Sequence, residues 1–544
     1  MNVKNNEFLF LPLGGIGKIG MNVNLYHYAG KWIIVDLGIG FADHNMPGVN
    51  LLVADLGFIA SKKKDLLGII ITHAHEDHCG ALPYLWKELQ CPVYTTKFTM
   101  NFLKEKFKEF RLQDQVPLKE VNINGIITLG PFTIEFIHMT HSIPEAHAIL
   151  ISVTVGSVLH TGDWKFDPKP VVGNVSNITR LKEIGITGDL LAVVCDSTNI
   201  LSTQKHESEG ALYDNIHTII KNSKKLVAIS LFASNVARIK TIVQVAQSLN
   251  RQVVLLGRSL CRIVKVAQES GYLSTKFNFL DAKHAKNIPR DQLVLLCTGC
   301  QGEPMAATSR LAYHTHQSFK IQPGDTIIFS SKTIPGNETE IRDMLNSFIN
   351  MGVEVITDKT DYIHASGHPT RVELQKLYSL IKPKISIPIH GEYIHIYKHV
   401  QFAKSCGIKQ ALMLSPGDMI NLENGYKSYT THAGFFGIDG AFLRHPNSNV
   451  IKMRKSMRDS GLIVVTVILD KNNVLIAKPI LFAPGVFAMR EDALILYKII
   501  EKIESICHLH ESTGIKHKIT NAILVIIREY VLKKPVIHIQ IEQL

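Results

Sequence analysis

The sequence predicts a multidomain α/β protein, and three features support this prediction. Short apolar segments of strand length alternate with amphipathic segments of helical period. Several apolar segments end at a His or Asp followed by a Gly- or Pro-containing turn, as expected where strands end together at one edge of a sheet. Because single domains usually contain about 100–200 residues, a chain of 544 residues is long enough for several hydrophobic cores.

The composition indicates a globular protein with an anionic partner. Hydrophobic residues make up 46% of the chain and charged residues 19%, which excludes a disordered protein. The net charge of +12 favours a nucleic acid, although a generally basic proteome would give the same charge, so the motifs must decide. Scattered cysteines, the lack of a signal peptide's apolar core and the lack of any apolar run of transmembrane length predict a cytoplasmic protein outside the membrane.

The strongest functional motif follows the predicted strand Leu67–Ile71. It reads Thr72-His73-Ala74-His75-Glu76-Asp77-His78. A loop at the end of a buried strand is a common place for a site, and alternate residues of such a loop point to two sides. The spacing H-x-H-x-D-H can therefore serve two metal ions. Imidazole and carboxylate groups suit Zn²⁺, and Mn²⁺ is also compatible with them.

A dinuclear site needs further ligands, and three downstream residues share the placement of this motif. Each stands where an apolar run gives way to a Gly- or Pro-containing turn. They are His141 after the strand that starts at Phe132, Asp163 after the alternation from Ile149 to Val158, and His390 after the run from Ile385. Each is weak evidence alone, but together with the first motif they predict a sheet edge lined with metal ligands.

Two other segments bear on the fold. Gly15–Gly20 fits the pattern G-x-G-x-x-G, but the following residues, Met21 to Tyr28, read as a strand and offer no helix N-terminus to a dinucleotide. Near the C-terminus, an alternating run at Gly461–Leu469 precedes a helical segment at Glu491–Cys507 and a final strand-like segment. We therefore expect a small C-terminal α/β domain, which serves either in dimerisation or only in stability.

The motifs resemble those of the metallo-β-lactamase superfamily. The resemblance implies an αββα sandwich with two Zn²⁺ ions per subunit, and Mn²⁺ or Mg²⁺ as alternative ions in activity. It assigns one ion to His73, His75 and His141, and the other to Asp77, His78 and His390, with Asp163 bridging the two ions. Asp77 and Asp163 are then also catalytic residues. Asp36, in the motif Val35-Asp36-Leu37-Gly38, matches an Asp that orients the ligands without binding metal.

More than two hundred residues separate Asp163 from His390, which is enough for an inserted domain. The motifs of this insert, among them Thr298-Gly299-Cys300-Gln301-Gly302, resemble the β-CASP domain, and the whole chain resembles the bacterial ribonuclease J family. The resemblance implies a metallo-β-lactamase domain at 1–208 and 373–449, a β-CASP domain at 209–372 and a C-terminal domain at 450–544. Lys18 and His44-Asn45 stand where acidic residues are usual, so we do not expect a structural calcium ion.

The segment from His364 to Pro369 is expected to be a loop, because Ser366-Gly367 and Pro369 oppose a helix. In the family this loop binds the substrate phosphate. Backbone N–H groups near Gly367 and the Ser366 hydroxyl can surround an anion, and His368 can supply a proton near the leaving oxygen. The resemblance also implies that Ser234 and Asn235 bind a terminal 5′-phosphate. The expected substrate-binding set is Ser234, Asn235, His364, Ala365, Ser366, Gly367 and His368.

These observations predict a metal-dependent ribonuclease with 5′→3′ exonuclease and endonuclease activity. The resemblance implies single-stranded, 5′-monophosphorylated RNA as the substrate, roles in mRNA decay and rRNA maturation, and a homodimer or homotetramer. Three alternatives remain open: a β-CASP endonuclease of RNA or DNA processing, a non-catalytic RNA-binding subunit, and a small-molecule hydrolase. The full set of ligands disfavours a non-catalytic subunit, and the long insert disfavours a small-molecule hydrolase.

Overall fold

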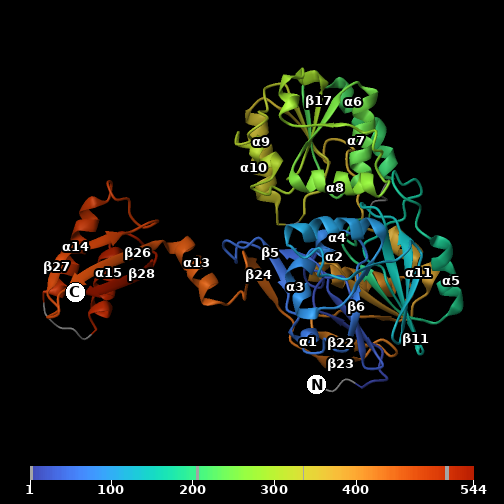
Figure 1. Ribbon diagram of the computed structural model, residues 1–544, viewed down its shortest axis with the longest axis horizontal. Coiled ribbons are helices and arrows are strands. Elements are labelled where there is room, and N and C mark those ends of the chain that lie inside the picture. The colour runs from blue at the N-terminus through green and yellow to red at the C-terminus, as the bar shows by residue number, and fades with distance from the viewer. Residues whose placement is uncertain (1–3, 204–207, 335, 509–513) are drawn as a thin grey trace. The chain divides into compact units, whose positions relative to one another are not determined.

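The computed structural model describes residues 4–203, 208–334, 336–508 and 514–544. The chain forms two compact units. The first comprises Met1–Gly40 and Ala54–Gly434, and the second comprises Phe41–Val53 and Phe435–Leu544. Figure 1 shows that the first unit itself contains two layered bodies, one built from the blue, teal and orange segments and the other from the green and yellow ones.

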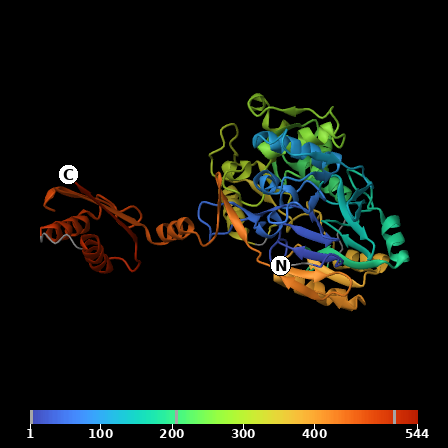
Figure 2. The same ribbon diagram turned by 60° about the horizontal axis from the view of Figure 1, so that its bottom comes forward.

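The larger body of the first unit is a sandwich of two mixed sheets. The first sheet has the order β23-β22-β1-β2-β3-β6-β7-β8. Its strands are β23 (Lys427–Thr430), β22 (Asp418–Asn421), β1 (Leu9–Pro12), β2 (Asn24–Tyr28), β3 (Lys31–Val35), β6 (Leu66–Ile70), β7 (Val93–Thr95) and β8 (Leu118–Glu120). Because β1 pairs with β22, the start of the chain and a segment some four hundred residues later lie side by side (Figure 2).

The second sheet has the order β21-β20-β13-β12-β11-β10-β9. Its strands are β21 (Gln410–Ala411), β20 (Ile385–Ile389), β13 (Leu190–Asp196), β12 (Gly156–His160), β11 (Ala146–Val153), β10 (Phe132–Met139) and β9 (Ile126–Leu129). The run from Ile149 to Val158, which reads as one alternation in the sequence, is divided between two antiparallel strands that turn at Thr154-Val155. Most residues of both strands are buried on either side of this turn.

Apolar side chains from both sheets fill the interior of the sandwich, including Phe10, Ile33, Phe136 and Ile387. Helices cover the outer faces. Leu181, Leu377 and others on α5, α11 and α12 pack on the second sheet, and α3 and α4 lie along the first (Figure 1). The helices are α1 (Gly57–Ala60), α2 (Glu76–Cys79), α3 (Leu82–Leu89), α4 (Lys97–Glu109), α5 (Ile178–Thr187), α11 (Arg371–Ile381) and α12 (Tyr393–Ser405). The predicted αββα sandwich is confirmed.

The inserted body is a parallel six-stranded sheet between helices, with the order β16-β15-β17-β14-β18-β19. Its strands are β14 (Val227–Ser230), β15 (Gln252–Leu256), β16 (Phe279–Leu280), β17 (Leu293–Cys297), β18 (Thr326–Phe329) and β19 (Glu354–Ile356). Its helices are α6 (Leu212–Asn222), α7 (Val236–Ser248), α8 (Arg258–Glu269), α9 (Ala307–Ala312) and α10 (Glu338–Asn350). Short 3₁₀ turns occupy Glu209–Ala211, His284–Asn287 and Arg290–Gln292. α8 meets α4 of the sandwich, where Lys265 lies 3.1 Å from Glu105 (Figure 1).

The second unit contains the predicted C-terminal α/β domain. One sheet, in the order β25-β24-β5-β4, combines β24 (Phe435–Asp439) and β25 (Phe442–Arg444) with β5 (Leu51–Ala54) and β4 (Ile39–Phe41). α13 (Asn449–Ser460) follows. The other sheet, β27-β26-β28, packs one face on two helices. These elements are β26 (Leu462–Leu469), β27 (Leu475–Phe482), α14 (Ala493–Cys507), α15 (Ile515–Arg528) and β28 (Val536–Gln543).

Several sequence-based expectations can be compared with these elements. The helical segment expected at Glu491–Cys507 coincides with α14, and the alternating run from Gly461 is β26. All eight cysteines are free thiols. Among the described residues, no helix combines the length and the apolar composition that a membrane span requires. The domain limits at 208/209, 372/373 and 449/450 stay predictions.

Candidate metal centre

The predicted ligands converge although they come from distant parts of the chain. The H-x-H-x-D-H motif begins three residues after the end of β6 and runs into the short helix α2. His141 follows β10, Asp163 follows β12, and His390 follows β20. Each side chain therefore extends from a strand end, where the flanking sheet is buried and rigid. His390 adopts a φ of 55°, a left-handed backbone conformation that turns the chain sharply at the sheet edge.

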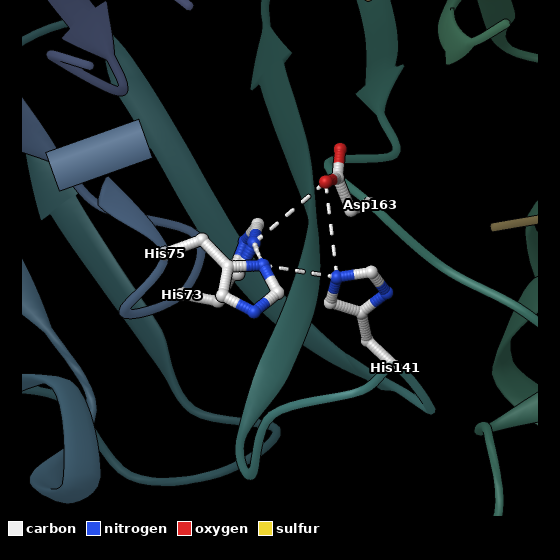
Figure 3. A group of neighbouring side chains, drawn as sticks. All are labelled: His73, His75, His141 and Asp163. Atoms are coloured by element: carbon white, nitrogen blue, oxygen red, sulfur yellow. Dashed lines mark hydrogen bonds and ion pairs between the residues drawn. The ribbon is translucent and has the colours of Figure 1, made fainter. Parts of the chain in front are cut away.

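The first group of donor atoms comprises His73, His75, His141 and Asp163 (Figure 3). His75 Nδ1 lies 3.0 Å from His73 Nε2 and 3.1 Å from His141 Nε2. Asp163 Oδ2 lies 3.8 Å from both His73 Nε2 and His141 Nε2. Three imidazole nitrogens and one carboxylate oxygen thus face a common point.

The second group comprises Asp77, His78, His390 and the same Asp163. His390 Nε2 lies 2.9 Å from Asp77 Oδ2, and His78 Nε2 lies 3.2 Å from Asp163 Oδ2. Asp163 belongs to both groups, so its carboxylate is common to the two sets of donor atoms. The structure brings together all seven predicted ligands in the division that the resemblance implies.

The donor set fits two ions of the zinc type. Ligand atoms about 2.0–2.2 Å from a tetrahedral ion are roughly 3.3 Å from one another, and the separations in both groups are close to this value. The Oδ1 atom of Asp163 is buried and, within the described part of the chain, accepts no hydrogen bond. Buried carboxylate oxygens are seldom left without a partner, so a cation at this atom accounts for its burial better than the protein alone.

Hydrogen bonds fix the ring orientation of three ligands. His141 Nδ1 donates to the carbonyl of Gly367 over 2.6 Å, and His78 Nδ1 donates to Asp36 Oδ2 over 2.6 Å. A carbonyl or carboxylate can only accept, so both rings carry a proton on Nδ1 and point Nε2, the nitrogen that would bind a cation, toward the centre. His390 Nδ1 lies 2.7 Å from the hydroxyl of Thr198 and is held in the same way.

Asp36 occupies the position predicted for a residue that orients ligands. It is fully buried, and it accepts the Thr72 backbone N–H at 2.8 Å and the Thr72 hydroxyl as well as the proton of His78. The Thr72 hydroxyl lies 2.9 Å from His73 Nδ1. A single carboxylate therefore supports one histidine in each donor group, His78 directly and His73 through Thr72.

The two groups differ in their electrostatics. Burial lowers the pKa of the imidazoles of the first group, that of His75 to about 4, so these rings are neutral and their lone pairs are available. Burial acts in the same direction on His78 and His390, but the carboxylates of Asp163 and Asp77 outweigh it and raise the pKa of both rings, that of His390 to about 9. A cation in the second group must displace protons from these rings.

The predicted loop at His364–His368 lies against this centre and is not helical, as expected, since α11 begins only at Arg371. Gly367 has to be glycine, because a Cβ atom there would lie 2.7 Å from Cε1 of His141. The Ser366 hydroxyl accepts a hydrogen bond of 2.6 Å from the Asn199 amide. Ala365 and Ser366 line a small cavity of about 10 Å³ together with His141 and Lys165.

Ser234 and Asn235 lie in the inserted body, at the turn between β14 and α7. The Asn235 side chain caps α7 by accepting the N–H of Arg238, whose fully buried guanidinium donates to the Ile363 carbonyl at 2.9 Å. Arg238 thus links the turn that carries these two residues to Ile363, which directly precedes the loop that begins at His364. Among the described residues, no hydrogen bond joins Ser234 to this loop. Their predicted role in phosphate binding stays a prediction.

Sequence reasoning missed three residues of the centre. Asp196 accepts a hydrogen bond of 2.8 Å from His368 Nδ1, and Thr198 donates to Asp196 at 2.7 Å while it contacts His390. Lys165 is buried beside the loop and pairs with Asp167 at 3.1 Å. The signal for Asp196 was present, since this residue ends the fully buried strand β13 just as Asp163 follows β12.

The fold and centre define a metallo-hydrolase of the metallo-β-lactamase type, and comparisons with known families agree. Residues 19–202 match the metallo-beta-lactamase superfamily. Residues 224–348 match the ribonuclease J beta-CASP domain, residues 352–409 a Zn-dependent metallo-hydrolase RNA specificity domain, and residues 449–544 the ribonuclease J C-terminal domain.

Similar proteins extend this match over most of the chain. A ribonuclease J of Sinorhizobium meliloti is 39% identical over 88% of this chain and 85% of its own length. Ribonuclease J 1 of Streptococcus pyogenes is 32% identical over 90% of this chain and 88% of its own length. The chain belongs to the ribonuclease J family. A solved structure from Enterococcus faecalis of unknown function shares the fold, with a TM-score of 0.52 and 16% identity over 76% of this chain and 99% of its own.

Proposed function

We propose that this protein is a zinc-dependent ribonuclease that degrades RNA in the 5′→3′ direction from a monophosphorylated end and also cleaves RNA internally. The observation that carries the proposal is the pair of donor groups joined by Asp163, which lies beside a loop suited to bind phosphate. Ribonuclease J relatives and the net charge of +12 support RNA as the substrate. Roles in mRNA decay and rRNA maturation in the cytoplasm, and a homodimer or homotetramer, belong to the same proposal.

Seven residues would hold two Zn²⁺ ions, for which Mn²⁺ or Mg²⁺ could substitute in activity: His73, His75, Asp77, His78, His141, Asp163 and His390. When bound, the ions would supply a water molecule of lowered pKa and neutralise charge on the scissile phosphate.

The chain's own groups account for the proton on the leaving side. His368 donates through Nδ1 to Asp196, and the same nitrogen is 3.8 Å from Asp163 Oδ2. Burial acts to lower the pKa of His368, but the carboxylates of Asp196 and Asp163 outweigh it and raise the pKa, which favours the protonated ring. We assign to His368 the donation of a proton to the 3′-oxygen that leaves, with Asp196 as the residue that positions it.

The preference for a 5′ end would arise in the β-CASP body. A terminal monophosphate carries more charge than a backbone phosphate and needs hydrogen-bond donors in a limited volume. Ser234, Asn235, His364 and Ser366, with Ala365 and Gly367 as neighbours, are the candidates for this pocket. A triphosphate would be too large for it, and a hydroxyl would leave its donors without partners.

The decisive experiment digests one RNA, labelled at either end, that carries a 5′-monophosphate, triphosphate or hydroxyl. We expect mononucleotides to be released from the 5′ end of the monophosphorylated RNA most rapidly. Ser234→Ala combined with Ser366→Ala should reduce this preference and spare internal cleavage. Equal rates for the three ends would contradict the pocket, and internal cuts alone would favour a β-CASP endonuclease. RNA binding without turnover would indicate a non-catalytic subunit.

A further inference from the structure

Two tyrosines are exposed beside the metal centre on the first turns of α12. Tyr393 and Tyr397 are one helical turn apart, and each exposes 48% of its surface although large aromatic side chains are usually buried. Tyr393 is only three residues after the ligand His390. Between the two tyrosines, Ile394 is also about half exposed. An apolar surface with flat aromatic rings therefore adjoins the second donor group.

The glycine-rich segment Gly15–Gly20 connects Tyr393 to the ligands. The Gly15 carbonyl accepts the backbone N–H of His390 at 2.6 Å. A Cβ atom on Gly17 would lie 2.8 Å from Cε2 of Tyr393, so the tyrosine ring occupies space that only a glycine leaves open. At the other end of the segment, a Cβ atom on Gly20 would lie 3.2 Å from that of Asp77. The segment thus runs from the tyrosine ring to the metal centre.

Cations accompany this apolar surface. Lys18 is exposed in the middle of the glycine-rich segment and forms a backbone bridge to Gly391. Lys398 is exposed on α12, with its ammonium 5.9 Å from the ring centre of Tyr397. Glu392 is an exposed carboxylate on the same turn. Exposed aromatic rings with neighbouring cations are the combination that binds single-stranded nucleic acids, whose bases stack and whose phosphates pair with lysine.

We propose that Tyr393, together with Lys18, forms a subsite for a nucleotide on the 3′ side of the scissile phosphate, with the base stacked on the tyrosine ring and a backbone phosphate at the lysine. This inference rests on the proposed function. The His364–His368 loop touches both donor groups, through the Gly367 carbonyl at His141 and through the His368 ring, which stacks on His390 with 5.6 Å between ring centres. The glycine-rich segment touches His390 and Asp77 of the second group. We infer that a strand whose 5′ end is bound by the His364–His368 loop leaves past Tyr393.

The test is a chemical double-mutant cycle on 5′-monophosphorylated RNA hexamers. Each hexamer of the series lacks one base, and the abasic position differs from one hexamer to the next. Base–aromatic stacking strengthens binding by about 5- to 150-fold. For the wild-type protein, we expect one abasic position 3′ of the cleaved bond to weaken binding about ten-fold. Tyr393→Ala should weaken binding of the intact hexamer by a similar factor, and the abasic change should then have no further effect. Tyr393→Phe should bind like the wild type.

Two readouts keep this test separate from the test of the proposed function. The value of kcat/KM reports on the holoenzyme, whereas fluorescence anisotropy with the metal-stripped full chain reports on binding without turnover. Tyr426→Ala is the matched control, because this tyrosine is 72% exposed and lies on the turn between β22 and β23. Lys18→Ala should reduce the slope of log affinity against log salt by about 0.7, the value for one phosphate on a single strand.

The proposal is overturned if the effects of Tyr393→Ala and of every abasic position add independently, or if the variant binds RNA like the wild type. If the protein does not cleave RNA but the effects of Tyr393→Ala and of one abasic position on binding are still not additive, the proposed function is refuted and the subsite is supported. If Tyr393→Ala leaves RNA binding unchanged and alters the oligomeric state in sedimentation, the surface is a protein interface and the subsite is wrong.

Discussion

Asp36→Asn is the most informative single change at the centre, because it preserves shape and removes one charge. Asp36 Oδ1 accepts the Thr72 N–H at 2.8 Å, and Oδ2 accepts the proton of His78 Nδ1 at 2.6 Å. An amide can offer an acceptor to only one of these donors and turns its NH₂ group toward the other. If the NH₂ faces His78, the ring must carry its proton on Nε2, the atom that would bind the second ion.

The expected loss follows from this bond. A hydrogen bond to a charged group contributes about 1.5–3 kcal/mol, which corresponds to roughly 10- to 100-fold in affinity, the range found when partners of metal-binding histidines are removed. Titration of Zn²⁺ into the metal-free protein, followed by calorimetry, should show a weakened site in which His78 participates. The other site should change less, because its contact with Asp36 runs through Thr72.

Asp65→Asn is the control for this titration, since Asp65 is a half-exposed carboxylate that pairs with Lys31 on the surface of the same sandwich. It should leave both affinities unchanged. The reasoning would be refuted if Asp36→Asn bound two ions as tightly as the wild type while it remained folded. It would also be refuted if only the site containing His75 were weakened.

Three further predictions test the centre and its surroundings. His368→Ala should keep both metal ions and lower the rate of cleavage, as measured by metal analysis beside single-turnover kinetics; a parallel loss of zinc would make His368 a ligand or a support for one. Chelation should lower the thermal midpoint of unfolding, because the clustered carboxylates and protonated imidazoles then lack their cations, and an unchanged midpoint would argue against tightly bound ions. His147 is buried and, within the described residues, neither ring nitrogen has a hydrogen-bond partner; burial lowers its pKa from 6.5 to about 3. Below about pH 6.5 the unfolded chain therefore binds a proton at His147 that the folded chain does not bind. The free energy of unfolding decreases as the pH is lowered from about 6.5 toward 3. Between pH 7 and pH 5, the free energy of unfolding measured with denaturant should fall by about 2 kcal/mol less in His147→Phe than in the wild type. An equally steep pH dependence in the variant would contradict the assignment of this loss to His147.

The sequence predicted the residues of the two donor groups because each one stands at a recognisable boundary. His141, Asp163 and His390 follow buried strands, and three imidazoles with a carboxylate between His73 and His78 are typical of a metal site. Their division between two ions came from family resemblance, and the donor-atom distances agree with it. The apolar runs predicted an α/β protein, whereas the αββα sandwich was expected from the family resemblance.

Other features depend on tertiary contacts that no local pattern encodes. The carbonyl of Gly367 orients His141 across 226 positions of sequence, and a backbone acceptor has no signature in the side chains. Asp196 acts on His368 from 172 positions away, and its place in the sequence did not indicate this contact. The role of Gly15–Gly20 was also hidden, because its pattern matches dinucleotide binding while the contact that requires glycine at Gly17 is with Tyr393.

The central claim is that two ions share Asp163 and that both are required to cleave RNA. The most direct measurement adds Zn²⁺ stepwise to the metal-free protein and follows both bound metal and cleavage of a 5′-monophosphorylated RNA. We predict that cleavage appears only as the second equivalent binds, and that Asp77→Ala retains one ion with almost no activity. Full cleavage with one equivalent, or without any metal, would contradict the claim.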